Sequence, residues 1–477
     1  MLRFWNARTM RGLTSPSIDR GWRSIFTLLA AFTSLFAFFF NYYSFAVLYN
    51  HLIVVYRQID HNQTAEASAN SSSWVEPGLC SHDDNLGGIT AWIGSICMVL
   101  LGALSPVSAY LCRPLGYRMV IMIGSLLFGL GMSLTAAVTT SPWQGVLLYG
   151  VLGGVGGAFI YAPALSLIPL HFDKHLSLAS GIAISACFLG PTVGSPISQA
   201  VVDRFDSGGL AILYGLLGLL SFGTAILIRP SLRATEATSE ATPEATPEAT
   251  NGALAMFTSA KENPRVIVWI FVMACEFFLL LITIVHMIRH AECSLQLDTT
   301  SSSLLLTYLN LSTALGSVIT GLVGRRVKSP IYLQMSLMII SGSLAVFFPL
   351  YNSYVLLAIF SVLFGLTVSM AGLMPFVISF IMGARLAPHG VFLMTFVTGI
   401  LAPLGPPLAG WMYDLFGNYQ YSFVVTGLVV VLTATVEIGL EAVFQRKRNR
   451  REKETQDETI IETAFHDSIV NIRETSL

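Results

Sequence analysis

Twelve runs of mostly apolar residues follow one another along this chain, and they restrict its fold more than any other feature. A membrane-spanning helix needs about 20 such residues. The runs lie near 24–48, 88–111, 119–138, 143–168, 178–202, 209–228, 265–287, 303–323, 331–350, 354–382, 390–412 and 421–443. The sequence therefore predicts an all-α membrane protein with twelve transmembrane helices.

The composition excludes other classes of protein. Charged residues make up 11% of the chain and hydrophobic residues 54%, whereas soluble domains carry about 25% charged residues. With a net charge of −1, the chain has no basic domain for nucleic acid. The six cysteines form no Cys-x-x-Cys pair, which disfavours a zinc site. Without a metal-ligand cluster or a nucleophile–base motif, we expect no cofactor, no metal and no enzyme activity.

The distribution of basic residues predicts the orientation. With the N-terminus inside, 23 of the 26 Lys and Arg residues fall on the cytoplasmic side. Only Arg57, Arg204 and Arg289 fall outside. Basic residues concentrate in cytoplasmic loops, so we expect both termini to be cytoplasmic, in a protein of the plasma membrane.

A polar segment divides the chain into two halves. Glu-Ala-Thr and Pro-Glu-Ala-Thr repeats occupy part of it, from Thr235 to Thr250, and such a composition is typical of disorder. Six runs precede this segment and six follow it, which is the layout of a transporter with its site between the halves. The predicted parts are a cytoplasmic segment 1–23, a six-helix half 24–228, a disordered linker 229–264, a second six-helix half 265–443 and a cytoplasmic tail 444–477.

The longest predicted outer loop, 56–87, carries candidate modification sites. Asn62-Gln-Thr and Asn70-Ser-Ser are acceptor patterns for N-glycosylation. Cys80 and Cys293 both fall in predicted outer loops, where the surroundings permit a disulfide. Either a bridge or two free thiols fits the sequence.

Several short motifs lie at the ends of predicted helices or within them. They are Asp19-Arg-Gly-Trp22 before the first run, Ala91-Trp-Ile-Gly-Ser95 and the Arg113–Arg118 turn around the second, His171-Phe-Asp-Lys174 with Leu178-Ala-Ser-Gly181 at the fifth, and Leu404-Gly-Pro-Pro-Leu-Ala-Gly410 with Tyr413-Asp414 at the eleventh. Together they resemble the monocarboxylate transporter family of the major facilitator superfamily, over about residues 19–228 and 265–443. The resemblance implies the major facilitator fold and alternating-access transport of a small organic acid or related solute, by uniport or proton-linked symport.

The chain departs from this family where charge matters. The proton-coupled, lactate-type members carry a lysine in the first helix and an Asp and an Arg in the eighth. Tyr43, Thr313 and Ser317 stand at those positions here. A carboxylate is normally held by an intramembrane cation, so we expect a neutral or zwitterionic solute or a weakly held acid.

Neutral polar residues form a stripe in the eighth run. Ser303, Thr307, Asn310, Thr313, Ser317 and Thr320 recur at steps of three or four residues, which places them on one helical face. Such a face lines a wet cavity or packs against another helix. The candidate substrate-binding residues are Asn41, Tyr43, Tyr161, Tyr308, Asn310, Thr313 and Ser317.

Glu276 is the one acidic residue that the sequence places near the middle of the bilayer. An acidic residue there costs about 2.5 to 3.5 kcal/mol on insertion scales, so it needs a partner, a cavity or a proton. Thr283 and His286 continue a polar face toward the outer side. We therefore predict proton coupling through Glu276 and His286; a neutral carboxyl group bonded across a helix contact is the alternative.

The C-terminal tail suggests two interactions. Arg446-Lys-Arg-Asn-Arg-Arg451 anchors the topology or binds anionic lipid. The final Glu474-Thr-Ser-Leu477 has the form that PDZ domains bind. The main functional prediction is a secondary transporter, and the alternative is a transporter-like membrane sensor or scaffold that signals through this tail.

Overall fold

The computed structural model describes residues 21–44, 85–138, 141–228 and 252–474. Every regular element within these ranges is a helix. Nine helices are long and apolar enough to cross a membrane, and shorter apolar helices occupy 94–103 and 330–346. One of the nine, α8, contains two predicted runs. The described elements are therefore consistent with twelve spans.

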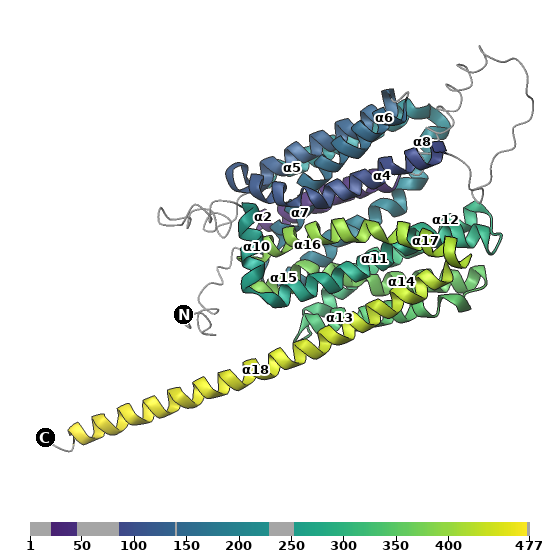
Figure 1. The fold of residues 1–477 in the computed structure, drawn as a ribbon. Helices are drawn as coiled ribbons and strands as arrows, with labels where there is room; N and C mark the ends of the chain where they lie inside the picture. Colours follow the sequence, from purple (N-terminus) through teal and green to yellow (C-terminus); the bar gives the residue numbers. More distant parts are fainter. Residues whose placement is uncertain (1–20, 45–84, 139–140, 229–251, 475–477) are drawn as a thin grey trace, which may run out of the picture.

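The first half consists of α2 to α8 (Figure 1, purple to blue). Its helices are α2 (Trp22–Tyr43), α4 (Asn85–Ala103), α5 (Ser105–Val138), α6 (Pro142–Gly145), the π-helix η1 (Val146–Gly153), α7 (Gly154–His171) and α8 (Leu176–Ala225). α5 bends at Gly116, where φ is +78°, and α8 bends at Asp206, where φ is +52°. Glycine adopts a positive φ without strain, which explains the choice of residue at 116. Each of the two bends separates consecutive spans.

The second half consists of α11 to α18 (Figure 1, green to yellow). Its elements are α11 (Pro264–Cys293), α12 (Thr299–Gly324), α13 (Pro330–Val346), η3 (Phe348–Leu350), α14 (Tyr354–Val368), η4 (Ser369–Leu373), α15 (Met374–Met382), α16 (Ala387–Leu401), η5 (Ala402–Leu404), α17 (Gly405–Phe416) and α18 (Gln420–Glu474). The helix α12 begins where the Asp298 carboxylate accepts a hydrogen bond from the Ser301 N–H, at 3.0 Å. Hydrogen bonds from Ser301 also hold the pKa of this carboxyl below its usual value.

The apolar surface and the close helix contacts both fit a lipid environment. Ile212, Leu315 and Leu432 are each more than half exposed on the outside of the bundle, where lipid replaces water as the solvent. Small residues bring helices together inside each half. A Cβ added to Gly129 would lie 3.0 Å from the Gly218 Cα, so α5 and α8 meet almost backbone to backbone.

The structure differs from the predicted linker at one point. Residues 229–251 lie outside the described residues, but α10 (Gly252–Glu262) is a helix packed onto both halves. Its Met256 is fully buried. Phe257 meets Phe396 of α16 edge to face at 5.9 Å, and the Ser259 hydroxyl lies 3.3 Å from His389 Nδ1. The predicted disorder therefore does not extend to residues 252–262, because these residues form a helix with an apolar face to bury.

Candidate substrate cavity

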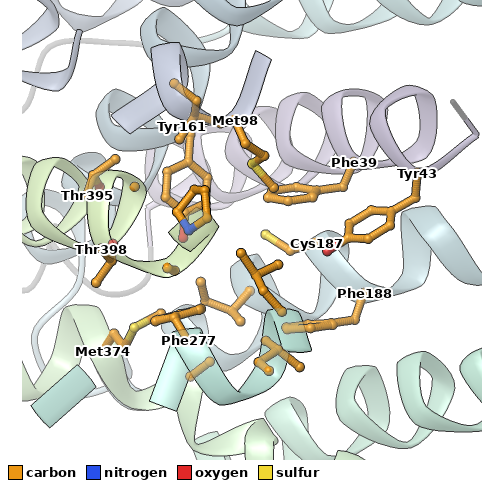
Figure 2. Close-up of a pocket in the computed structure, with 18 residues that line it drawn as sticks. Phe39, Tyr43, Met98, Tyr161, Cys187, Phe188, Phe277, Met374, Thr395 and Thr398 are labelled. Carbon is orange, nitrogen blue, oxygen red and sulfur yellow. The ribbon is translucent and has the colours of Figure 1, made fainter. Parts of the chain in front are cut away.

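A cavity lies between the two halves, and both contribute to its wall (Figure 2). The space within it measures about 780 Å³, including the part open to solvent. The first half supplies Phe39, Tyr43, Met98, Leu101, Tyr161, Ile184, Cys187 and Phe188, and the second half Phe277, Leu280, Leu281, Ala371, Met374, Thr395, Thr398, Gly399, Ala402 and Pro403.

Aromatic rings form much of the wall on the side of the first half. Phe39 stacks on Tyr43 one helical turn later, with ring centroids 6.2 Å apart. It also meets Tyr161 of α7 edge to face at 5.8 Å. Figure 2 shows these three rings opposite Phe277 and Met374 of the second half. The cavity therefore presents aromatic faces to a solute from both sides.

None of the described residues that line the cavity is charged. The polar side chains among them are those of Tyr43, Tyr161, Cys187, Thr395 and Thr398. Each threonine donates to its own helix: Thr395 to the Val391 carbonyl at 2.9 Å, and Thr398 to the Met394 carbonyl at 2.7 Å. Because a hydroxyl has one hydrogen, any further hydrogen bond to either oxygen must come from a donor.

The halves meet closely on one side of the cavity. We call this side the basic end, because Arg113, Arg118, Arg325 and Arg326 lie in the turns there. A Cβ added to Gly102 of α4 would collide with the backbone of Gly399 in α16. Since Gly399 itself lines the cavity, this glycine contact borders the cavity directly.

Hydrogen bonds reinforce the closure of the basic end. The Ser105 hydroxyl donates to the Phe392 carbonyl at 2.8 Å, and the Ser177 hydroxyl to the Gly321 carbonyl at 2.8 Å. A Cβ added to Gly181 would collide with the Ser317 carbonyl oxygen. The cavity is thus closed toward the predicted cytoplasm in this conformation.

The structure places the predicted substrate-binding residues in two groups. Tyr43 and Tyr161 line the cavity, whereas Asn41, Tyr308, Asn310, Thr313 and Ser317 are absent from its lining. Asn41 is fully buried, and neither atom of its amide has a hydrogen-bond partner among the described residues. The Tyr308 hydroxyl lies 3.3 Å from that of Tyr354.

The polar stripe of α12 bonds to its own helix and, through Thr320, to a neighbouring element. The Thr313 hydroxyl donates to the Leu309 carbonyl at 2.7 Å, and Ser317 donates to Thr313 at 2.8 Å. Thr320 bonds the Ser369 carbonyl of η4 at 3.1 Å. In this conformation the stripe packs α12 against its neighbours, and substrate contact by Asn310, Thr313 or Ser317 stays a prediction.

Glu276 is buried in α11 but is not part of the cavity lining, although its neighbour Phe277 is. The Ser341 hydroxyl of α13 donates to its Oε1 at 2.8 Å, while its Oε2 has no hydrogen-bond partner among the described residues. His286 lies farther along α11, stacked on Tyr419 at 4.6 Å, with its Nε2 2.9 Å from the Pro406 carbonyl. The structure thus keeps the two predicted proton-coupling residues apart from each other and from the cavity.

The remaining predicted positions belong to the parts of the chain that the structure leaves undescribed. Asn62, Asn70, Cys80 and the last three residues all lie outside the described residues. The side chain of Cys293 is likewise not described. Glycosylation, the Cys80–Cys293 bridge and PDZ binding therefore stay predictions.

The sequence reasoning missed most of the cavity wall. Phe39, Phe188 and Phe277 resemble ordinary apolar residues of a membrane helix. Thr395 and Thr398 carried a usable signal, because they lie three residues apart on one face of a run that is otherwise apolar.

The comparisons with known proteins agree with this architecture. Residues 27–403 match the family model described as the Major Facilitator Superfamily. Monocarboxylate transporter 13 of Rattus norvegicus is 29% identical, with 74% of this chain and 80% of the relative covered. Monocarboxylate transporter 2 of Mus musculus is 27% identical, with 76% and 78% covered.

Solved structures share the fold at low sequence identity. The human organic anion transporter MFSD10 (TETRAN) superposes with a TM-score of 0.66 at 15% identity, covering 87% of this chain and 99% of that one. The proton:xylose symporter XylE gives a TM-score of 0.64 at 12% identity, covering 87% and 94%. Together with the family match, these findings confirm the predicted fold class and the resemblance to monocarboxylate transporters: the chain belongs to the Major Facilitator Superfamily and is a multi-pass, monocarboxylate-transporter-like secondary transporter.

Proposed function

We propose that the protein moves a small organic solute, either a monocarboxylate-like acid or a neutral or zwitterionic relative, across the plasma membrane by alternating access. One observation carries the proposal. The cavity is walled by both halves, and glycine contacts between those halves close it on one side. A rocking motion that separates Gly102 from Gly399 would open the same cavity to the basic end.

The orientation in the membrane is part of the proposal. The bias of 23 basic residues to three supports cytoplasmic termini, so the closed side faces the cytoplasm. The cavity is then positioned to receive a solute from the outer side. The name of the rat relative supports the organic-acid class, and the lack of charge among the lining residues that the structure describes supports the neutral class.

Proton coupling through Glu276 is a separate element of the proposal. The carboxyl group is buried in α11, and one of its oxygens has no described partner. Phe277 and Leu280 on the same helix reach the cavity. A change in the charge of Glu276 would therefore act on the cavity through the position of α11, without touching the solute.

Reconstitution tests the transport proposal. The purified full chain would be placed in liposomes, and uptake of labelled lactate and of its neutral analogue lactamide would be measured with and without a pH gradient. We expect saturable uptake of at least one compound above the rate in protein-free liposomes. A membrane sensor or scaffold, the second candidate, is favoured by the continuation of α18 far beyond the span; such a protein would move no solute from a wider panel of organic acids and amides.

A further inference from the structure

The polar groups of the cavity restrict the chemistry of its ligand. Thr395 and Thr398 use their only hydrogens on their own helix, so they offer acceptors. Pro403 has no N–H, so it cannot bond the carbonyl of Gly399 four residues earlier. Among the described side chains that line the cavity, only the hydroxyls of Tyr43 and Tyr161, and weakly the Cys187 thiol, are able to donate. The cavity therefore matches a solute that brings hydrogen-bond donors of its own.

A carboxylate fits this arrangement poorly. It accepts hydrogen bonds and donates none, so it would face the threonine oxygens without a favourable contact. Burial of an ionised group in an apolar cavity is costly unless a cation or several donors compensate, and none of the described residues that line this cavity is charged. A hydroxyl or an amide N–H has no such cost, because either one pairs directly with a threonine oxygen.

The aromatic wall adds a requirement for shape. Phe39, Tyr43 and Tyr161 form one connected set of rings, and Phe277 faces them across the cavity (Figure 2). Aromatic pairs gain stability beyond the burial of their area when they stack offset or edge to face. A solute with a flat ring would use these faces, whereas a three-carbon acid would leave them without a partner.

We infer that this cavity selects an uncharged, ring-bearing solute that carries a hydroxyl or amide hydrogen-bond donor. The ring lies among Phe39, Tyr161 and Phe277, and the donor meets the oxygens of Thr395 and Thr398 on α16. This inference rests on the proposed transport function and names the substrate class of the same site.

Four compounds that separate charge from ring provide the test. Phenyllactamide has a ring and no charge, phenyllactate has a ring and a carboxylate, lactamide has neither, and lactate has only the carboxylate. Equilibrium binding to the purified full chain at pH 7 is the measurement, since uncharged ring compounds also cross lipid unaided. We expect phenyllactamide to bind at least about tenfold more tightly than any of the other three. The two acids each bury an unmatched charged group, and the two compounds without a ring lose its burial and its stacking on the aromatic wall.

Substitutions in the wall locate the binding. Thr398→Val removes an acceptor with little change of shape, and we expect phenyllactamide affinity to fall about tenfold. Thr398→Ser keeps the oxygen and should restore the affinity. Thr435→Val is the matched control, because Thr435 makes the same bond to its own helix, at 2.7 Å to Val431, on the exposed face of α18. Tyr161→Phe should likewise weaken binding, with the exposed Tyr421→Phe as its control.

The results separate the substrate class from the transport function. Phenyllactate or lactate binding as tightly as phenyllactamide overturns the inference, as does no measurable binding of phenyllactamide at millimolar concentration. Equal effects of Thr398→Val and Thr435→Val remove the assignment to α16. If phenyllactamide binds as expected but no compound is carried into liposomes, the transport proposal fails while the substrate class stands; saturable uptake of lactate alone gives the opposite result.

Discussion

One tyrosine of the cavity lining lies at a position where the sequence resemblance implies a charge difference. By that resemblance Tyr43 takes the place of the lysine expected in lactate-type members, and it lines the cavity beside the Phe39 ring. A phenol offers a hydrogen bond without a fixed charge. Tyr43 thus extends the aromatic wall and also leaves its position without a cation.

The Glu276→Gln substitution tests proton coupling. The amide oxygen still accepts the bond from Ser341, but the side chain no longer titrates. We expect folded protein whose uptake no longer responds to a pH gradient. Ser341→Ala is the control, because it removes the partner and leaves the carboxyl group. Uptake with the wild-type rate and wild-type pH dependence in the Gln variant would leave Glu276 as a structural hydrogen-bonding group.

A buried pair in the second half makes a stability prediction. The Trp269 indole N–H donates to the Gln334 side-chain oxygen at 2.7 Å, and both residues are fully buried. Gln334→Leu should destabilise the fold by about 1 to 3 kcal/mol, because it leaves that N–H without a partner. The midpoint of thermal unfolding in detergent measures the effect. Adding Trp269→Phe removes the orphaned donor, so the double variant should lose less than the two single losses combined; strict additivity would refute the coupling.

Helical periodicity explains which residues the sequence could assign to the site. It correctly grouped Thr313 and Ser317 on one face of α12, but it does not say which neighbour that face meets. The structure places that face against η4 and α8, where Gly181 comes into contact with Ser317. Tyr43 and Tyr161 belong to separate helices, and only the tertiary fold brings them both to the cavity.

The spans were predictable at the scale of elements because their apolar lengths follow from the thickness of the bilayer. Their bends were less so. The predicted run 354–382 forms α14, η4 and α15, and the run 390–412 forms α16, η5 and α17. Pro375, Pro403 and Pro406 lie at or next to these breaks, since proline removes a backbone donor. The helix α10 escaped prediction because its apolar face spans only eleven residues.

The contact of α4 with α16 makes a prediction about the transport cycle. Gly102→Val should disfavour closure of the basic end, because its side chain would overlap the Gly399 backbone. Cys187 lines the cavity and serves as a natural reporter. We expect faster labelling of Cys187 by a membrane-impermeant thiol reagent applied from the basic end, with the site identified by mass spectrometry.

Gly439→Val is the matched control for this experiment. It places the same side chain in α18, where an added Cβ meets nothing within 4 Å. Its labelling rate should equal that of the unchanged protein. If Gly102→Val also labels at that rate, the glycine contact does not hold the basic end closed.

The whole molecule makes a topological prediction. Both termini should lie in the cytoplasm, because the basic residues concentrate on that side. An epitope tag after Leu477 should bind antibody on cells only after permeabilisation, whereas a tag inserted within 56–87 should bind on intact cells. Antibody access to the C-terminal tag without permeabilisation would reverse the orientation of the cavity as well.

The helix α18 joins the second half of the molecule to a helical extension beyond the membrane-spanning part. Its apolar part ends at Phe444, and residues 445–474 continue the same helix for about 45 Å. Because the span and the extension form one continuous helix, each degree of rotation of the second half displaces the far end by about 0.8 Å. A protein or lipid bound at the far end would be displaced once in each transport cycle, so its motion would report the transport rate. A firm attachment at the same end would in turn slow the cycle.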